Sequence, residues 1–293
     1  MNHPTEPAVV HRSINVDGVD TFYREGGLEG APVLLLPHGY PSSSFEFRRL
    51  IPALADRYRL IAPDFPGFGY TSLPDGFDAS FGGYTEFLAR FADRLGLGRY
   101  ALYLHDYGSQ VGLRLAMRAP ERVTALIVQN GDIYEDELGP KYGGLKAYFA
   151  NPTPAGRQKL FDAVTKEGYR EEFLNGSEHI AERITPDNWE LAWALTTPER
   201  REVFVGLMEG LEDNLAWFPR YQAYLREHRP PTLVVWGPRD GYMPEGAARA
   251  YLRDLPDAEL HLIEDGGHWL LETHLDEVVA LVRGFLGHAD PAG

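Results

Sequence analysis

Short apolar runs alternate along the chain with longer stretches in which apolar residues recur every three or four positions. The short runs predict β-strands and the longer stretches predict amphipathic helices. The predicted strands are HRSINVD (11–17), DTFYRE (20–25), APVLLLPHGYP (31–41), YRLIAP (58–63), YALYLHD (100–106), TALIVQNG (124–131), TLVVWG (232–237) and AELHLIE (258–264). Gly18 joins the first two, which predicts an antiparallel pair, whereas helical stretches between the later strands indicate a largely parallel sheet.

This alternation is interrupted once, between residues 132 and 228. The interruption contains helical patches such as LKAYFA and WELAWALT and is rich in Tyr, Trp, Phe, Glu and Arg. It is too long for a plain loop and too apolar for a disordered segment. We therefore expect an α/β core formed by residues 1–131 and 229–293, with a helical cap of residues 132–228 inserted after the sixth strand.

Composition and charge narrow the functional classes. The 293 residues are 44% hydrophobic, which is enough for a packed core, and the absence of cysteine excludes disulfides and thiol chemistry. A net charge of −15 disfavours nucleic acid and anionic membranes as partners; it either serves solubility or steers cationic substrates. The N-terminus has no apolar segment typical of a signal peptide, and no apolar run is long enough to span a membrane. We expect a cytoplasmic protein with a frayed C-terminal HADPAG.

Three polar residues follow predicted strands. Asp106 follows YALYL, Asp240 follows TLVVWGPR, and His268 follows AELHLIEDGG. Ligands of open α/β sheets bind at the carboxyl ends of the strands, so these side chains are expected to converge. Their order along the chain is nucleophile, acid and histidine, as in the Ser-Asp-His order of α/β-hydrolases.

Four motifs carry a family resemblance. They are HGYP (38–41), DFPGFGYTS (64–72), HDYGS (105–109), and GGHW (266–269) with WGPRD (236–240) upstream. Together the chain resembles the α/β-hydrolase superfamily, and within it the epoxide hydrolases and haloalkane dehalogenases that use an aspartate nucleophile. The resemblance implies an α/β-hydrolase fold with a mostly parallel, eight-stranded sheet flanked by helices.

The resemblance also implies a mechanism. Asp106 would attack an electrophilic carbon and form an alkyl-enzyme ester, which water activated by His268 would hydrolyse. Asp240 would orient His268 and stabilise its charged form. The backbone N–H groups of Tyr40 and Tyr107 would form the oxyanion hole.

Alternatives exist for two of these roles. Asp132, just after the strand TALIVQN, is a rival to Asp240, although Asn130 stands at the position where some relatives place the acid. Asp106 alone would more often be a helix cap, but its context favours a nucleophile. Ser109 follows the elbow too late to be a serine nucleophile.

The residues that decide the leaving group depart from the family pattern. Dehalogenases of this family hold the halide with a Trp after the nucleophile and often an Asn after His-Gly, whereas this chain has Tyr107 and Tyr40. Epoxide hydrolases use two cap tyrosines as acids, and the insertion contains six: Tyr134, Tyr142, Tyr148, Tyr169, Tyr221 and Tyr224. The candidates for substrate contacts are His38, Tyr107, Tyr148, Trp217, Phe218 and Tyr221, although His38 is also a candidate for structural hydrogen bonds beneath the oxyanion turn.

Three hypotheses remain open. The first is an epoxide hydrolase-like enzyme for small apolar substrates, the second is a haloalkane or haloacid dehalogenase, and the third is a non-catalytic protein that binds a small hydrophobic ligand. The predicted partners are a small hydrophobic substrate and water, with no cofactor, because no phosphate loop is present and no His, Glu and Asp residues have metal-ligand spacing. The chain is expected to be a monomer or homodimer.

Overall fold

The computed structural model describes residues 9–289 and contains an eight-stranded sheet. All eight predicted strands are present. They are β1 (Val10–Val16), β2 (Val19–Gly26), β3 (Val33–Leu35), β4 (Arg59–Pro63), β5 (Tyr100–His105), β6 (Val123–Gln129), β7 (Thr232–Trp236) and β8 (Glu259–Leu262). Their order across the sheet is β1-β2-β4-β3-β5-β6-β7-β8.

The strand directions follow the sequence prediction. β1 pairs with β2 and β2 with β4 in antiparallel fashion, whereas every pairing from β4 through β3, β5, β6 and β7 to β8 is parallel. The carboxyl ends of these parallel strands therefore lie along one edge of the sheet. β5 is buried along its whole length, which places its end in the middle of that edge.

Helices connect the strands. They are η1 (Ser44–Phe47), α1 (Leu50–Leu54), α2 (Phe81–Arg94), α3 (Tyr107–Arg118), η2 (Pro120–Arg122), η3 (Glu135–Glu137), η4 (Pro140–Tyr142), α4 (Gly143–Ala150), α5 (Pro154–Ala163), α6 (Lys166–Leu174), η5 (Glu178–Arg183), α7 (Asp187–Ala194), α8 (Pro198–Leu215), α9 (Phe218–His228), α10 (Glu245–Asp254), α11 (Leu270–Thr273) and α12 (Leu275–Ala289). The apolar spacing of residues 42–56 is typical of one helix, but the segment forms η1 followed by the short α1. Pro52 explains the break, because it lacks an N–H and its ring would clash with the carbonyl group of Arg48 in a continuous helix.

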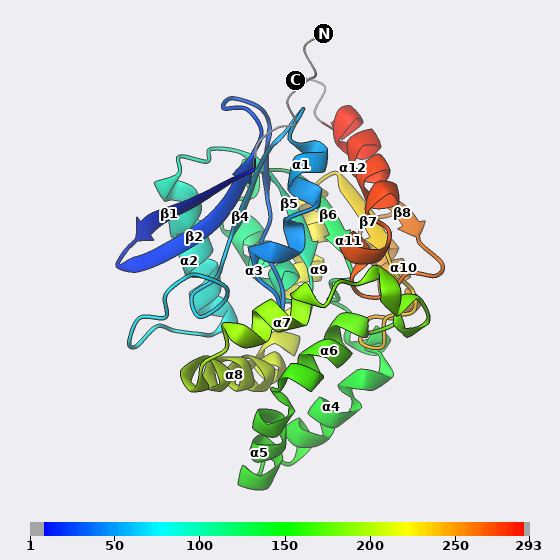
Figure 1. The fold of residues 1–293 in the computed structure, drawn as a ribbon. Coiled ribbons are helices and arrows are strands. Elements are labelled where there is room, and N and C mark those ends of the chain that lie inside the picture. The colour runs from blue at the N-terminus through cyan, green and yellow to red at the C-terminus, as the bar shows by residue number, and fades with distance from the viewer. Residues whose placement is uncertain (1–8, 290–293) are drawn as a thin grey trace.

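Two apolar clusters flank the sheet. One lies between the sheet and α1 and α12 and includes Phe47 and Val278. The other lies on the opposite face, includes Phe91 and Tyr251 from α2 and α10, and continues into the inserted helices. Figure 1 shows the corresponding layers, with α1 and α12 on the near face and α2, α3, α9 and α10 on the far face. The two clusters hold the sheet edge in a fixed position.

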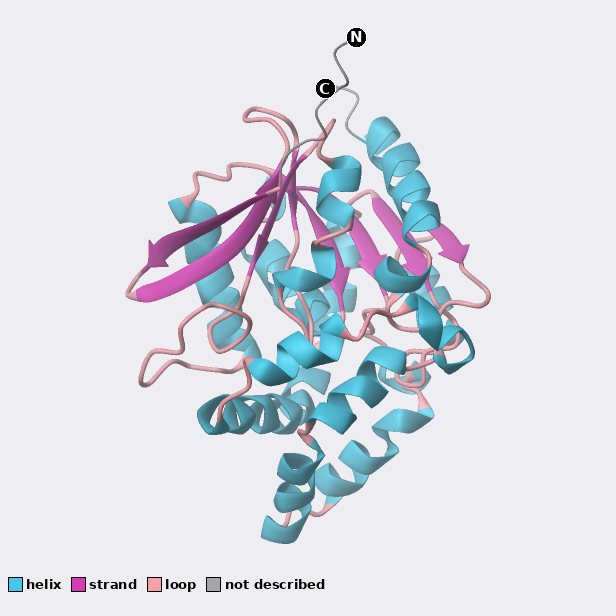
Figure 2. Cartoon of the chain, viewed as in Figure 1, coloured by secondary structure: helices cyan, strands magenta, loops and turns pink. Residues whose placement is uncertain are grey.

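The inserted helices form a layer beyond the carboxyl ends of the strands. Figure 2 shows this lower layer as helices and loops, with the strands above it. α4, α5, α6, α7 and α8 belong to it, but α9, the last inserted helix, packs against α3 and α10 of the core. The insertion therefore covers the site with its earlier helices and joins the core with its last one.

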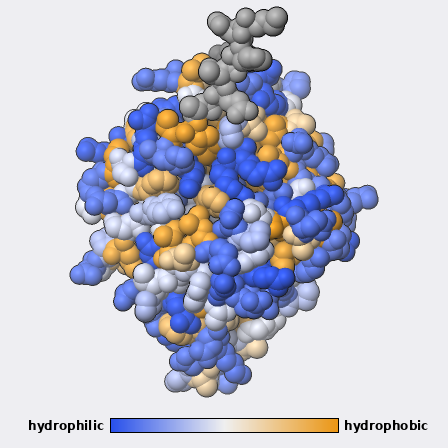
Figure 3. All heavy atoms as spheres, viewed as in Figure 1, coloured by the Kyte–Doolittle hydropathy of each residue, from blue (hydrophilic) through white to orange (hydrophobic). Residues whose placement is uncertain are grey.

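The surface is mostly hydrophilic on the face seen in Figure 3, and its apolar residues occur in small groups. Among the described residues, no helix has the length and apolar character needed to cross a membrane. Of the C-terminal HADPAG (288–293) that was expected to be frayed, residues 288 and 289 instead end α12. Residues 290–293 and residues 1–8 of the N-terminus lie outside the described part of the chain.

Candidate active site

Asp106 occupies a strained turn between β5 and α3. Its backbone has a φ of 49° and a ψ of −131°, a left-handed conformation that is rare for a residue other than glycine. Gly108 permits this turn, because a Cβ atom there would lie 2.1 Å from the carbonyl oxygen of Pro37. The strand, turn and helix together lift one carboxylate above the sheet edge, as the sequence predicts.

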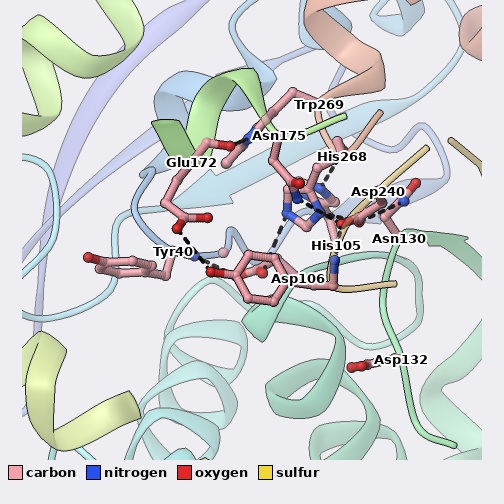
Figure 4. A network of polar contacts seen from close by, with 12 residues as sticks. Tyr40, His105, Asp106, Asn130, Asp132, Glu172, Asn175, Asp240, His268 and Trp269 are labelled. Atoms are coloured by element: carbon pink, nitrogen blue, oxygen red, sulfur yellow. Dashed lines mark hydrogen bonds and ion pairs between the residues drawn. The ribbon is translucent and has the colours of Figure 1, made fainter. Parts of the chain in front are cut away.

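The two oxygen atoms of Asp106 have different surroundings. Oδ1 accepts a hydrogen bond of 2.7 Å from the backbone N–H of Tyr40, and Oδ2 lies 3.5 Å from Nε2 of His268. The carboxylate is therefore oriented by a backbone donor on one side and faces an imidazole on the other. Figure 4 shows both neighbours around it.

His268 lies between two carboxylates. Its Nδ1 is 2.6 Å from Oδ2 of Asp240, which follows β7, while Nε2 faces Asp106. Burial by itself lowers the pKa of the imidazole, but the charges and hydrogen bonds of Asp240 and Asp106 outweigh burial and raise the pKa from 6.5 to about 10. The structure thus brings together the three residues that the sequence placed at strand ends.

Asp240 is buried and fully hydrogen-bonded. Oδ2 also accepts a hydrogen bond from Nδ2 of Asn130 at 2.9 Å, and Oδ1 accepts from Nδ2 of Asn175 at 2.7 Å and from the N–H of Tyr242 at 2.9 Å. Burial would raise the pKa of this carboxyl, but His268 and these donors hold the pKa below its ordinary value. Asp240 is therefore a stable anion beside the imidazole.

Asp132, the rival acid, has a different environment. Its side chain is completely buried, and Nε2 of Gln110 donates to its backbone oxygen at 3.1 Å and to Oδ1 at 3.4 Å. Burial raises the pKa of Asp132 to about 8, so the carboxyl is largely protonated at neutral pH. The geometry therefore pairs His268 with Asp240, and Asn130 serves as a donor to that acid.

A cavity of about 360 Å³ opens above Asp106 and His268. Its volume lies within the range of small-molecule sites. One part of the wall is apolar and consists of Leu145, Leu160, Met208, Leu211 and Met243, and another is aromatic and consists of Tyr40, Tyr107, Tyr142, Tyr242 and Trp269. Lys141, Thr165 and Glu172 add polar groups. The cavity combines an apolar wall with a small number of polar groups near the triad.

The comparisons with known proteins agree with this geometry. A family model described as "alpha/beta hydrolase fold" matches residues 32–275. The chain belongs to the α/β-hydrolase family. Its sequence is 34% identical to the uncharacterised hydrolase YNR064C of Saccharomyces cerevisiae over 273 residues, which cover 90% of this chain and 94% of that protein.

This α/β-hydrolase is also similar to two haloalkane dehalogenases, one in sequence and one in fold. The sequence is 27% identical to haloalkane dehalogenase 2 of Mycobacterium bovis over 260 residues, 86% of each chain. The fold is similar to the crystal structure of the putative ancestral haloalkane dehalogenase AncHLD2, with a TM-score of 0.79, 26% identity, and coverage of 96% of this chain and 100% of that chain.

His38, a predicted substrate contact, does not line the cavity. Both of its ring nitrogens are occupied by the backbone: Nδ1–H donates to the carbonyl oxygen of Gly39 at 2.9 Å, and Nε2 accepts from the N–H of Phe65 at 3.0 Å. His38 lies outside the cavity wall. It instead supports the turn that presents the N–H of Tyr40, which is the structural role also considered for it.

Tyr148 is likewise not a cavity residue of this α/β-hydrolase. Its hydroxyl group donates to Glu209 of α8 on the outer side of the cap. Tyr142, which ends η4 just before α4, lines the cavity instead. The short helix α4 turns the two tyrosines to different sides, which the weak periodicity of this segment did not reveal.

The remaining three predicted substrate contacts lie at α9, away from the cavity. Tyr221 is buried, accepts a hydrogen bond of 2.7 Å from Nε of Arg114 on α3, and donates to Asn214 at 2.8 Å. Trp217 stacks on the same guanidinium group at 4.0 Å, and Phe218 is buried in the apolar core. They lie outside the cavity wall because α9 packs on the core rather than over the site.

Sequence reasoning missed the residues of the cap that touch the triad. The carbonyl oxygen of Asn175, just after α6, accepts a hydrogen bond of 3.1 Å from the N–H of His268, while its side chain donates to Asp240. The indole N–H of Trp269 donates to the carbonyl oxygen of Glu172 at 2.9 Å. The C-terminal end of α6 is therefore fastened to the loops that carry the acid and the histidine.

His105 supports the site from below. Its Nδ1 lies 3.0 Å from Oε1 of buried Glu46, and its Nε2 lies 3.1 Å from the carbonyl oxygen of His268. As expected for a residue that precedes Asp106 on the strand, it points away from the cavity. It fixes the backbone of His268 rather than contacting a ligand.

Proposed function

We propose that this α/β-hydrolase uses Asp106 as a nucleophile to open small, largely apolar epoxides through a covalent ester. One observation carries the proposal: the carboxylate of Asp106 lies at the floor of a cavity of about 360 Å³, with Oδ1 on a backbone donor and Oδ2 beside His268. A carboxylate is an effective nucleophile toward an electrophilic sp³ carbon. The elbow therefore favours attack on carbon over acyl transfer.

In the first step, Oδ2 forms a bond to an epoxide carbon and the carbon–oxygen bond of the ring breaks. The product is a hydroxyalkyl ester of Asp106, and the departing oxygen takes up a proton. The N–H of Tyr40 donates to Oδ1, and the N–H of Tyr107 at the start of α3 is the second proposed donor. These donors hold the oxygen that becomes negatively charged when water later attacks Cγ.

In the second step, His268 activates water. The pKa of about 10 keeps its imidazole protonated in the free protein at neutral pH. Ester formation makes Asp106 neutral and removes one of the two charges that raise this pKa, so the pKa falls. His268 then becomes a base at the stage when a water molecule must be deprotonated, while Asp240 retains the imidazole orientation.

The cavity favours an epoxide over a halide as the reacting group. Trp269 lines the cavity, but its indole N–H is already donated to the carbonyl oxygen of Glu172. Tyr40 and Tyr107 supply hydroxyl groups in place of further N–H donors. Ring opening needs a proton for oxygen, whereas halide departure needs N–H donors around an anion.

A haloalkane dehalogenase is the second candidate. It is supported by the similarity to haloalkane dehalogenase 2 and to the AncHLD2 structure. Both reactions share the nucleophile and the ester. The non-catalytic alternative gains less support, because His268 lies between the two carboxylates, 3.5 Å from Asp106 and 2.6 Å from Asp240.

Trapping the ester tests this proposal. In His268→Gln, ester hydrolysis should be blocked while ester formation continues, so incubation with styrene oxide should add the full mass of the epoxide to the protein. The adduct should map to the peptide that carries Asp106 and should be absent from the His268→Gln/Asp106→Ala double variant. With bromobutane, an adduct lacking bromine would instead favour the dehalogenase. No adduct with any epoxide or haloalkane would refute the nucleophile assignment.

A further inference from the structure

The carboxyl group of Glu172 has no role in the triad but lies in the same cavity. It belongs to α6 of the cap, and its side chain is 29% exposed, with part of its surface in the cavity wall. Figure 4 shows this carboxylate directed toward the side of the site where Tyr40 and Asp106 lie. A cap residue therefore places an ionisable group over the nucleophile.

Glu172 is held in place from two sides. The hydroxyl group of Tyr242 donates to its Oε1 at 2.9 Å, and Nζ of Lys141 lies 3.7 Å from its Oε2. Its own backbone oxygen accepts the indole N–H of Trp269. Glu172 is thus bound to Trp269, the residue after His268, and to Tyr242 in the loop that carries Asp240. These contacts give its carboxyl group a defined position relative to Asp106 and His268.

We propose that Glu172 is the acid that donates a proton to the departing epoxide oxygen, with Tyr242 as its positioning residue. This inference rests on the proposed epoxide opening at Asp106. The resemblance to epoxide hydrolases implies cap tyrosines for this purpose, but Tyr148 and Tyr221, the two cap tyrosines among the predicted substrate contacts, have their hydroxyl groups engaged outside the cavity.

Burial of Glu172 favours a proton on its carboxyl group when substrate binds. Burial is the largest cause that raises its pKa above the ordinary value, and Asp106 adds to this, while Lys141, Tyr242 and His268 oppose it. A neutral substrate that displaces water increases the desolvation further. Exposed Glu171, at the rim of the cavity, is the other acidic group of α6 that faces it.

The cavity tyrosines are weaker candidates for the same role. Burial raises the pKa of Tyr40, Tyr107, Tyr142 and Tyr242 well above 10. A general acid is most effective when its pKa lies near the working pH. The hydroxyl group of Tyr242 is moreover already donated to Glu172, so it orients the carboxyl rather than the substrate.

The proton balance closes over one turnover. Oδ2 of Asp106 bonds to carbon, the ring carbon–oxygen bond breaks, and the proton of Glu172 moves to the departing oxygen, which leaves Glu172 ionised. Ester formation lowers the pKa of His268, so the imidazole releases its proton to solvent and regains one when the carboxylate of Asp106 is restored. Water gives one proton to the neutral imidazole and its hydroxyl to Cγ of Asp106. Collapse of that intermediate releases the diol with the proton of His268, and the acid form of Asp106 returns a proton to Glu172 through solvent.

The test measures ester formation alone. In the His268→Gln background, the rate at which styrene oxide adds to the protein is followed by intact mass between pH 5 and 9. Adding Glu172→Gln should slow adduct formation about 100-fold, since general acids contribute roughly 10²–10⁴-fold. The parent rate should fall as pH rises through the pKa of Glu172, and the glutamine variant should lose this dependence.

Matched variants separate charge and folding from proton donation. Glu171→Gln removes one negative charge from the cavity rim and should change the rate less than about threefold, a change within the range of most surface substitutions. Glu172→Asp keeps an acid and should retain the pH dependence with a smaller loss of rate, and thermal unfolding checks that each variant is folded. Should Glu172→Gln itself fail to fold, the aspartate variant and Tyr242→Phe must still slow adduct formation.

The outcomes distinguish this inference from the proposed function. Adduct formation in the parent with an unchanged rate and pH profile in Glu172→Gln would overturn the role of Glu172 and leave Asp106 as nucleophile. If Glu172→Gln lost no more rate than Glu171→Gln, the role of Glu172 would also be overturned, because the removal of one negative charge would explain the loss. Absence of an adduct in the parent would instead reject the proposed function on which the inference rests.

Discussion

The core and the cap contribute to the same cavity in different ways. The core supplies Asp106, Asp240 and His268 from the ends of strands in a buried sheet, so their positions are fixed by the backbone of the fold. The cap supplies Glu172 and Asn175 from the end of one short helix, and hydrogen bonds to the core loops hold them there. The first set is positioned by the sheet, and the second only by its contacts.

This difference assigns separate tasks to the two regions. In the proposed reaction, residues at the sheet edge determine which bond forms, because Asp106 and His268 cannot move without changing the fold. In the same proposal, residues of the cap determine which leaving group is assisted, because a short helix can change its side chains while the sheet stays intact. A single core can in this way carry related reactions under different caps.

Removing the nucleophile should produce the largest effect. Asp106→Ala should lower turnover by about 10⁴-fold or more, since no other carboxylate lies at the floor of the cavity in the described residues, and loss of a catalytic nucleophile has effects of this order. Steady-state hydrolysis of styrene oxide measures it, with circular dichroism as the check on folding. Retention of most of the activity would show that the reaction does not pass through the elbow.

Loosening the contact between cap and core should have an intermediate effect. Asn175→Ala removes the donor to Oδ1 of Asp240 and the acceptor for the N–H of Gly241. A hydrogen bond to a charged group contributes roughly 1.5–3 kcal/mol, which corresponds to a loss of about 10- to 100-fold in the rate of ester hydrolysis. Single-turnover measurements of ester formation and ester decay should place the loss in the second step.

Asn188→Ala provides the comparison for that variant. Asn188 is also a buried asparagine of the insertion, but it lies on α7 and accepts a hydrogen bond from Arg48, away from the triad. The Asn188→Ala variant should have a lower melting temperature than the wild type and an unchanged rate of ester hydrolysis. If both variants slow decay equally, Asn175 acts through cap stability and not through the acid.

The core could be predicted from the sequence for a physical reason. Parallel strands place their carboxyl ends at one edge, so Asp106, Asp240 and His268 were expected to meet although 162 residues separate the first from the last. Gly108 belongs to the HDYGS motif, and the close approach of the Pro37 carbonyl oxygen explains why this position needs a glycine. In each case the local sequence determines the direction of the side chain, and the sheet determines where the end of the strand lies.

The cap could not be predicted in the same way. Tyr142 and Tyr148 are separated by six positions, and which of them faces the cavity depends on how a two-turn helix is placed on its neighbours. Trp217 and Tyr221 lie away from the cavity because Arg114 of α3 draws α9 onto the core. Glu172 is one of many acidic residues in the insertion, and no local signal distinguishes it.

A buried acid of the core should affect stability more than turnover. The pKa of Asp132 is raised from 3.8 to about 8 in the folded protein, so folding is favoured below pH 4 and this contribution is lost as pH rises to about 8. Asp132→Asn keeps a neutral group, so its stability relative to the wild type should increase by up to ~1.4 kcal/mol per pH unit in that window. Urea unfolding at pH 5 and 8 measures the difference.

The exposed Asp136→Asn variant is the control, because it makes the same chemical change at the surface, where Asp136 pairs with Arg253. Its stability difference from the wild type should remain nearly constant over the same pH range. A constant difference for Asp132→Asn as well would mean that Asp132 is ionised in the folded protein, and the preference of His268 for Asp240 would then need a cause other than charge.

The smallest effect is expected at Tyr148, and its value lies in the contrast with Tyr142. Tyr148→Phe removes a hydroxyl group that faces Glu209 outside the cavity, and such surface changes are worth about 0.5 kcal/mol or less, so kcat and KM should change by no more than about twofold. Tyr142→Phe removes a hydroxyl group from a ring in the cavity wall and should change KM several-fold more. If Tyr148→Phe slowed ester formation as strongly as Glu172→Gln, α4 would have to contact the substrate in a second arrangement of the cap. The cap would then take part in the reaction by changing its position, while the core stays fixed.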